Sequence, residues 1–150
     1  MRIGPKIKAD FPRVDRLLAF TIPRQGQRQK VVEMFSALSE LDEIRSAACF
    51  RDGTLPIIDC KPMADYGETN RDEPERVWIA RDLCEKLQAL SPMHRDSLHL
   101  SALIEQTALH EMVHWADLKN NGSFHGRSGP ADIGAEFEYR VFGRVLHEHP

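Results

Sequence analysis

Hydrophobic residues recur every three to four positions in two long stretches of the chain, a spacing that predicts amphipathic helices. The first stretch covers residues 27–49, with an apolar face made of Val31, Val32, Phe35, Leu38, Leu41 and Ile44. The second runs from Ser97 to Lys119 without a glycine or proline, and Asn120-Asn121-Gly122 follows as a stop signal. We expect the second helix to pack in the core through Leu103, Ile104, Ala108, Met112 and Val113.

Shorter apolar runs predict the remaining elements. Residues 55–60 and 77–80 are typical of strands, and residues 14–22 predict either a strand or a short helix. Residues 61–75 are rich in Pro, Asp, Gly, Asn and Glu and predict a long surface loop. Within it, Tyr66 is a candidate for the rim of a substrate cleft, and a solvated loop tyrosine is the alternative. The mixture of helices and short strands predicts an α+β fold.

Composition and charge exclude several classes of protein. A chain of 150 residues with 41% hydrophobic residues fits one globular domain over residues 1–150. The net charge of -3 and the lack of a basic block give no footprint for nucleic acid or an anionic membrane, so we expect neither partner. No apolar segment follows the first residues and none approaches a membrane span. We expect a protein made in the cytoplasm without a Sec signal peptide.

The three cysteines, Cys49, Cys60 and Cys84, lack the C-x-x-C spacing of a structural zinc site. We expect reduced, mostly buried thiols. A bridge between Cys49 and Cys60 in an oxidising compartment is the alternative.

The second predicted helix contains the pattern His-Glu-x-x-His at His110, Glu111 and His114. Residues four apart on a helix are displaced by only about 40° around the axis and about 6 Å along it, so both imidazoles can reach one metal ion. Glu111 projects beside them, where a carboxylate can take a proton from water activated by zinc. The alternative, an amphipathic helix with surface histidines, is disfavoured because the motif lies within an apolar helix.

A catalytic zinc ion needs a third protein ligand from elsewhere in the chain. The metzincin continuation would require Gly and His where the chain has Asp117 and Asn120, so that class is excluded. The Cα atom of Asp117 would lie about 10 Å along the helix axis from that of His110. We therefore expect Asp117 to cap the helix end or to orient a ligand imidazole.

Further carboxylates lie in residues 131–147, which predict a helix that starts near Pro130 and Asp132. Its apolar face would hold Gly134, Ala135, Glu138, Val141, Phe142 and Val145. A carboxylate on such a face needs a cation, so Glu138 is predicted as the third zinc ligand, with Gly134 allowing close approach to the motif helix. Pairing of Glu138 with Arg140 or Arg144 is one alternative. A shifted helix phase, which would make Glu136 the ligand, is another.

Three other side chains are candidates to stabilise an oxyanion. His125 lies between the two helices that carry the predicted site, His147 lies near the end of the sequence, and Tyr139, which ranks behind His125, lies on the second helix. Loop and terminal histidines are more often solvated, so none of these assignments follows from the sequence alone.

The segment Leu109-His-Glu-Met-Val-His-Trp115, followed by Asp132-Ile-Gly-Ala-Glu-Phe-Glu138 and Val141-Phe-Gly143, resembles small toxin-type zinc metallopeptidases. Such domains occur as bacterial effectors, including at the tails of VgrG and Rhs proteins of type VI secretion. The segment is also similar to the wider gluzincins, in which a downstream helical Glu completes the site. The resemblance implies a zincin-like α+β fold, with a small mixed sheet packed on the motif helix and a C-terminal glutamate helix. It also implies His110, His114 and Glu138 as zinc ligands and Glu111 as the base.

The expected function is zinc-dependent hydrolysis of peptide bonds by an endopeptidase that acts as a bacterial effector or toxin. The expected partners are a protein or peptide substrate and, as further candidates, a secretion-machinery carrier or a cognate immunity protein. A specialised secretion system would deliver the protein into a target cell. Two alternatives stay open: a zinc amidase acting on cell-wall or side-chain amides, and a non-catalytic interaction module stabilised by zinc.

Overall fold

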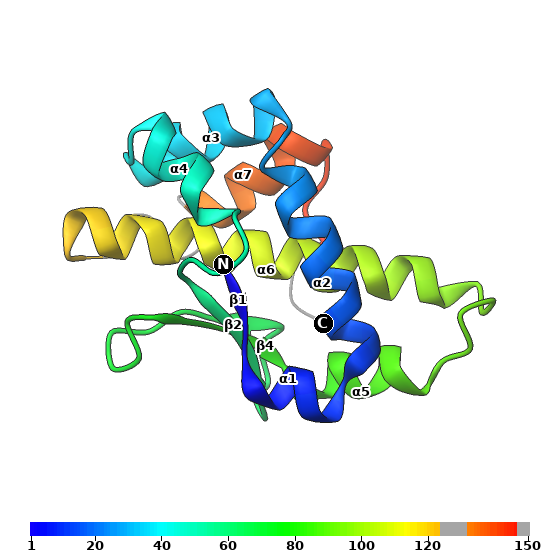
Figure 1. Cartoon of the computed structure of the whole chain (residues 1–150). Coiled ribbons are helices and arrows are strands. Elements are labelled where there is room, and N and C mark those ends of the chain that lie inside the picture. Colours follow the sequence, from blue (N-terminus) through cyan, green and yellow to red (C-terminus); the bar gives the residue numbers. More distant parts are fainter. Residues whose placement is uncertain (124–131, 147–150) are drawn as a thin grey trace.

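The computed structural model describes residues 1–123 and 132–146, and its longest element is helix α6 (Asp96–Asn121) (Figure 1). This helix runs through the middle of the molecule, as the buried residues of its second half require. It ends where Gly122 adopts a φ of 67°, a left-handed conformation that glycine adopts at little cost. The predicted helix over Ser97–Lys119 and its stop signal are therefore confirmed.

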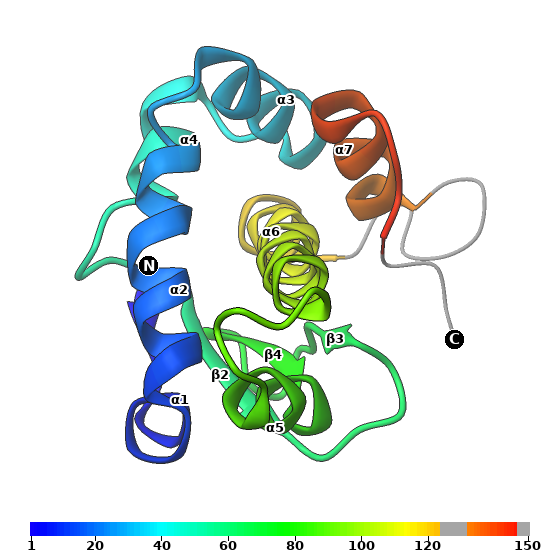
Figure 2. The same ribbon diagram turned by 90° about the vertical axis from the view of Figure 1, so that its right-hand side faces the viewer.

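Six more helices lie around α6 in the described residues. They are α1 (Pro5–Asp10), α2 (Pro12–Gln25), α3 (Gln29–Ser39), α4 (Glu43–Cys49), α5 (Arg81–Ala89) and α7 (Ile133–Phe142). Figure 2 looks nearly along α6, with α2, α3 and α7 arranged around one side of it and the sheet with α5 below. The motif helix is thus enclosed by elements from both ends of the chain.

A four-stranded sheet covers the other side of α6. Its strands are β1 (Arg2–Ile3), β2 (Ile57–Lys61), β3 (Gly67–Glu68) and β4 (Arg76–Ala80), in the order β1-β2-β4-β3. The first three in this order are parallel, and β3 pairs antiparallel with β4, with Gly67 opposite Ile79. The sheet is therefore small and mixed, as predicted, and β3 forms the edge that lies next to α6.

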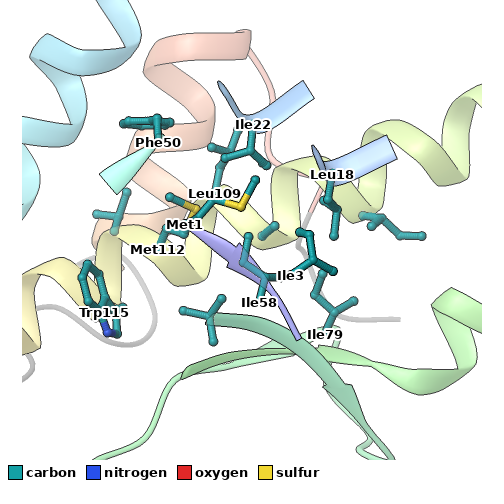
Figure 3. Packing of buried hydrophobic residues seen from close by; sticks show 14 of the residues in the cluster. Met1, Ile3, Leu18, Ile22, Phe50, Ile58, Ile79, Leu109, Met112 and Trp115 are labelled. Carbon is teal, nitrogen blue, oxygen red and sulfur yellow. The ribbon is translucent and has the colours of Figure 1, made fainter. Parts of the chain in front are cut away.

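Hydrophobic side chains from the sheet, α2 and α6 form one core. Figure 3 shows Leu109 and Met112 of α6 among Ile58 of β2 and Ile22 of α2, and all four side chains are fully buried. Burying a side chain of this size stabilises the fold by roughly 1.5–3 kcal/mol. This packing fixes the rotation of α6 about its axis and so decides where its polar side chains point.

The segment predicted as one helix over residues 27–49 is two helices, α3 and α4. Between them Glu40 adopts a left-handed φ of 58°, and the Asp42 carboxylate accepts a hydrogen bond from the Arg45 backbone N–H at 2.8 Å. That bond caps a new helix. The prediction is wrong about continuity because the apolar spacing carries on across the turn.

The other predicted elements are confirmed with changed bounds. Residues 14–22 lie within α2, so the helical alternative is confirmed, and the strands at residues 55–60 and 77–80 correspond to β2 and β4. The loop at residues 61–75 contains the short strand β3. The C-terminal helix predicted over residues 131–147 is shorter, because α7 ends before Gly143.

All three cysteines are free and buried, so the predicted burial is confirmed. No helix among residues 1–123 and 132–146 combines the length and apolar character needed to cross a membrane.

Candidate metal centre

Helix α6 presents the two histidines of the motif on its face toward α7. The Nε2 atoms of His110 and His114 lie 3.2 Å apart, and each residue is 3% exposed. The one-turn spacing brings the imidazoles together, and the apolar side chains on either side of the motif bury them. The predicted pair is therefore assembled by the helix alone.

Asp132 completes a three-membered cluster with these histidines. It is the N-cap of α7, where its Oδ1 accepts a hydrogen bond from the Ala135 backbone N–H at 2.9 Å. The same oxygen lies 3.5 Å from Nε2 of His110 and 3.3 Å from Nε2 of His114. Two imidazole nitrogens from α6 and one carboxylate oxygen from the N-cap of α7 thus converge on one point. These three residues could hold a metal ion.

The distances within the cluster fit a small, tetrahedrally coordinated cation. Ligand atoms bound at about 2.0–2.1 Å around a tetrahedral ion lie about 3.3–3.4 Å from one another. The three separations here are 3.2, 3.3 and 3.5 Å. Three such atoms held this close in a nearly buried position need a proton or a metal cation between them.

Glu138 fixes the orientation of the His110 ring. Its side chain is fully buried, and Oε1 lies 2.8 Å from Nδ1 of His110, while Oε2 accepts a hydrogen bond from the Leu146 backbone N–H at 2.8 Å. A carboxylate beside Nδ1 keeps the proton on that nitrogen, so the lone pair is on Nε2, which faces Asp132 and His114.

The helix phase predicted from the sequence agrees with these positions. Glu138 is buried, whereas the Glu136 side chain is 43% exposed and forms an ion pair with Arg140. The sequence predicts a metal ion beside Glu138. In the structure, the two carboxylate oxygens of Glu138 contact an imidazole and a backbone amide. The assignment of Glu138 as a metal ligand stays a prediction, and the geometry favours Asp132 in that position.

Charge and burial act on the ionisable groups of the cluster in opposite ways. Burial lowers the pKa of His110, which favours the neutral imidazole that a metal requires. Burial acts to raise the pKa of Asp132, but the hydrogen bond from His114 and the charge of His110 hold this pKa below its usual value. Within the cluster, these shifts favour a neutral His110 imidazole and an ionised Asp132 carboxylate.

Glu111 lies beside the cluster and is 5% exposed. Burial raises the pKa of its carboxyl group, and the nearby imidazoles of His110 and His114 oppose that change. The rise makes this carboxylate a stronger proton acceptor. Its Oε2 also accepts a hydrogen bond from the Thr69 hydroxyl at 2.9 Å.

Gly134 lets α7 approach the motif helix. A Cβ atom built at this position would lie 2.4 Å from Cδ2 and 2.5 Å from Nε2 of His110, well inside van der Waals contact. Only glycine fits between α7 and the imidazole, as the sequence pattern predicted.

Replacing Gly134 by alanine is expected to lower metal affinity by about 10-fold or more, the scale on which residues that orient ligands act. The added methyl group displaces the His110 ring, and with it Nε2. Chelator competition would measure the dissociation constant, with thermal unfolding as a check on the fold. An unchanged affinity in a folded variant would show that the ring moves aside without consequence.

The structure also places other residues that the sequence indicated as candidates. Asp117 is buried and its Oδ1 accepts a hydrogen bond from the Asn121 side chain at 2.6 Å, one turn further along α6. The backbone carbonyl of Tyr66 accepts from the Ala80 N–H at 2.8 Å, next to β3, and Tyr139 is 62% exposed. His125 and His147 lie outside the described residues.

Two residues of the site were not found by sequence reasoning. Asp132 was interpreted only as a helix start, although a carboxylate at the N-cap of the helix that carries Gly134 is placed to face the motif. Thr69 lies in a stretch without periodicity, and no local signal marks it. The roles of Asp132 and Thr69 arise from contacts between segments far apart in the chain, which local sequence patterns do not report.

Comparison with known protein families bears on the same elements. The family model described as metallopeptidase toxin 3 matches residues 7–143, a range that contains β3, α6 and α7. The chain belongs to this family. No curated protein and no solved structure matches it. Membership confirms the resemblance to toxin-type metallopeptidases and identifies the chain as a peptidase of that class. The family implies a metal, and His110, His114 and Asp132 are residues that could bind it.

Proposed function

We propose that this chain is a zinc-dependent endopeptidase whose metal is held by His110, His114 and Asp132. The observation that carries the proposal is the convergence of two Nε2 atoms and one Oδ1 atom at separations of 3.2 to 3.5 Å. Family membership supports the peptidase activity. The zinc and the roles of the individual residues are our inference.

The choice of zinc rests on the donor set. Two imidazoles and one carboxylate, with a fourth position for water, are typical of catalytic zinc sites. Sites for Mg²⁺ or Ca²⁺ are built from oxygen ligands. In this assignment Asp132 takes the place predicted for Glu138, and Glu138 orients His110 through Nδ1.

The chain's own residues supply the proton transfers of hydrolysis. A bound zinc ion would act as a Lewis acid that lowers the pKa of water and polarises the peptide carbonyl. Glu111 accepts a proton as the water oxygen attacks the carbonyl carbon. When the C–N bond breaks, Glu111 delivers this proton to the amine nitrogen, so it acts first as base and then as acid.

We also propose that the peptidase acts as a secreted toxin in a target cell. The family description supports a toxin. Delivery by a specialised secretion system, with a carrier protein and a cognate immunity protein as partners, is the route that we propose.

Zinc content and chelator sensitivity test the proposed function. The purified chain is expected to contain about one zinc ion per molecule by plasma mass spectrometry. Its hydrolysis of an unfolded protein substrate should stop on chelation and return when zinc is added. The His110→Ala/His114→Ala double variant is the control and should contain no zinc. Stoichiometric zinc in that variant would contradict the assignment of the site.

A further inference from the structure

Thr69 connects the edge of the sheet to the motif helix. It directly follows β3 and is 1% exposed. Its Oγ1 lies 2.9 Å from Oε2 of Glu111 and 3.0 Å from the backbone carbonyl oxygen of the same residue. One hydroxyl group therefore contacts both the side chain and the main chain of Glu111, from a segment 42 residues earlier in the chain.

Contact with both parts of one residue restricts its rotamer. A glutamate side chain has three rotatable bonds, and several staggered conformations compete when nothing holds it. The Thr69 hydroxyl bonds the carboxylate only when Oε2 lies near the helix backbone at position 111. A hydroxyl can also donate or accept, so it can remain bonded to Glu111 before and after the carboxylate takes up a proton.

Strand β3 confines the same carboxylate from a second direction. A Cβ atom built on Gly67 would lie 2.7 Å from Cγ and 3.0 Å from Oε1 of Glu111. The strand backbone thus packs closely against the glutamate stem. Its own position is fixed by pairing with β4, in which Gly67 is opposite Ile79 and Glu68 is opposite Trp78.

We propose that Thr69 is a positioning residue for peptide hydrolysis, which holds the Glu111 carboxylate in the orientation that accepts the proton. The proposal rests on the proposed function, because it assumes that Glu111 is the base. In this proposal Thr69 acts on the reaction through Glu111. A correctly aimed base accelerates proton transfer, whereas one that samples several rotamers spends much of its time in unproductive positions.

The test compares Thr69→Val with Thr69→Ser. Valine keeps the shape of threonine and removes the hydroxyl, so kcat is expected to fall about 10-fold, as for loss of a hydrogen bond to a charged group. KM and zinc content should not change, because Thr69 is not assigned to the substrate or the metal. Serine restores the hydroxyl and is expected to return kcat to within about 3-fold of the parent. Thr69→Ala should lower kcat by the same factor as Thr69→Val. It replaces Thr69→Val in the test if the valine variant does not fold.

Thr21→Val is a matched control. The Thr21 hydroxyl is also buried, in α2, and has no hydrogen-bond partner among the described residues. Its removal should leave kcat unchanged, which separates loss of one particular hydrogen bond from loss of any buried hydroxyl.

Three results would overturn the proposal. An unchanged kcat in Thr69→Val, in an enzyme whose activity depends on Glu111, overturns the assignment of Thr69 and leaves the proposed function intact. A fall in kcat that serine does not rescue, accompanied by loss of zinc, shows a merely structural role. If Glu111→Gln hydrolyses the substrate as fast as the parent chain, the proposed function is overturned, and the assignment of Thr69 is overturned with it.

Discussion

Replacing Asp132 by asparagine is expected to weaken zinc binding by about 100-fold or more, beyond the 10- to 100-fold typical of residues that only orient ligands. Asparagine is as good an N-cap as aspartate, so α7 keeps its first turn while the cluster loses its anionic donor. Chelator competition on the purified variant would measure the dissociation constant. Circular dichroism should show an unchanged helix content.

The decisive comparison is with Glu138→Gln. The glutamine carbonyl can still accept from one donor, but its amide group then faces the other, which weakens the hold on His110. We expect about a 10-fold loss of affinity. Glu136→Gln is the matched control on the exposed face of the same helix and should change nothing. If Glu138→Gln costs more than Asp132→Asn, then Glu138 is the ligand, as the sequence alone indicated.

The second large effect is expected for Glu111→Gln, which should lower kcat by about 10²- to 10⁴-fold, the usual contribution of a positioned general base. Glutamine preserves the size of the side chain and can still accept the Thr69 hydrogen bond, but it cannot take up a proton at neutral pH. Zinc content should equal that of the parent. A variant that cleaves as fast as the parent would place the base elsewhere.

The same variant tests the toxin hypothesis. Production of the parent chain in bacteria, with and without an added export signal, is expected to arrest growth in the compartment that contains its substrate. Glu111→Gln should be harmless there at equal protein levels. Growth arrest by both proteins would show that hydrolysis is not the cause of toxicity.

The local part of the site follows directly from the sequence. His110 and His114 are one helical turn apart, and the surrounding apolar residues demand burial, so the helix brings the two imidazoles together wherever it packs. The exposed Glu136 and buried Glu138 also follow, because helical phase depends only on spacing along the chain. Family membership of residues 7–143 agrees with the class of peptidase that these motifs indicated.

The break between α3 and α4 shows where this kind of inference stops. The apolar spacing is continuous over residues 27–49, and only the turn at Glu40 with the Asp42 cap separates the helices. Apolar spacing does not report where the chain turns, and beyond the turn it placed Ile44 on the buried face although this residue is 81% exposed. The same weakness led to a predicted C-terminal helix that was too long.

By itself the sequence determined the helix that carries the motif, the burial of its histidines and the class of chemistry, because all three depend on residues within a few turns of one another. Tertiary structure alone decided which carboxylate meets which imidazole nitrogen. Glu138 and Asp132 lie six positions apart and both face α6, but the docking of α7 over Gly134 directs Glu138 to Nδ1 of His110 and Asp132 to the Nε2 atoms. The contact from Thr69 to Glu111 likewise arises only when β3 packs against α6, since 42 residues separate the two along the chain.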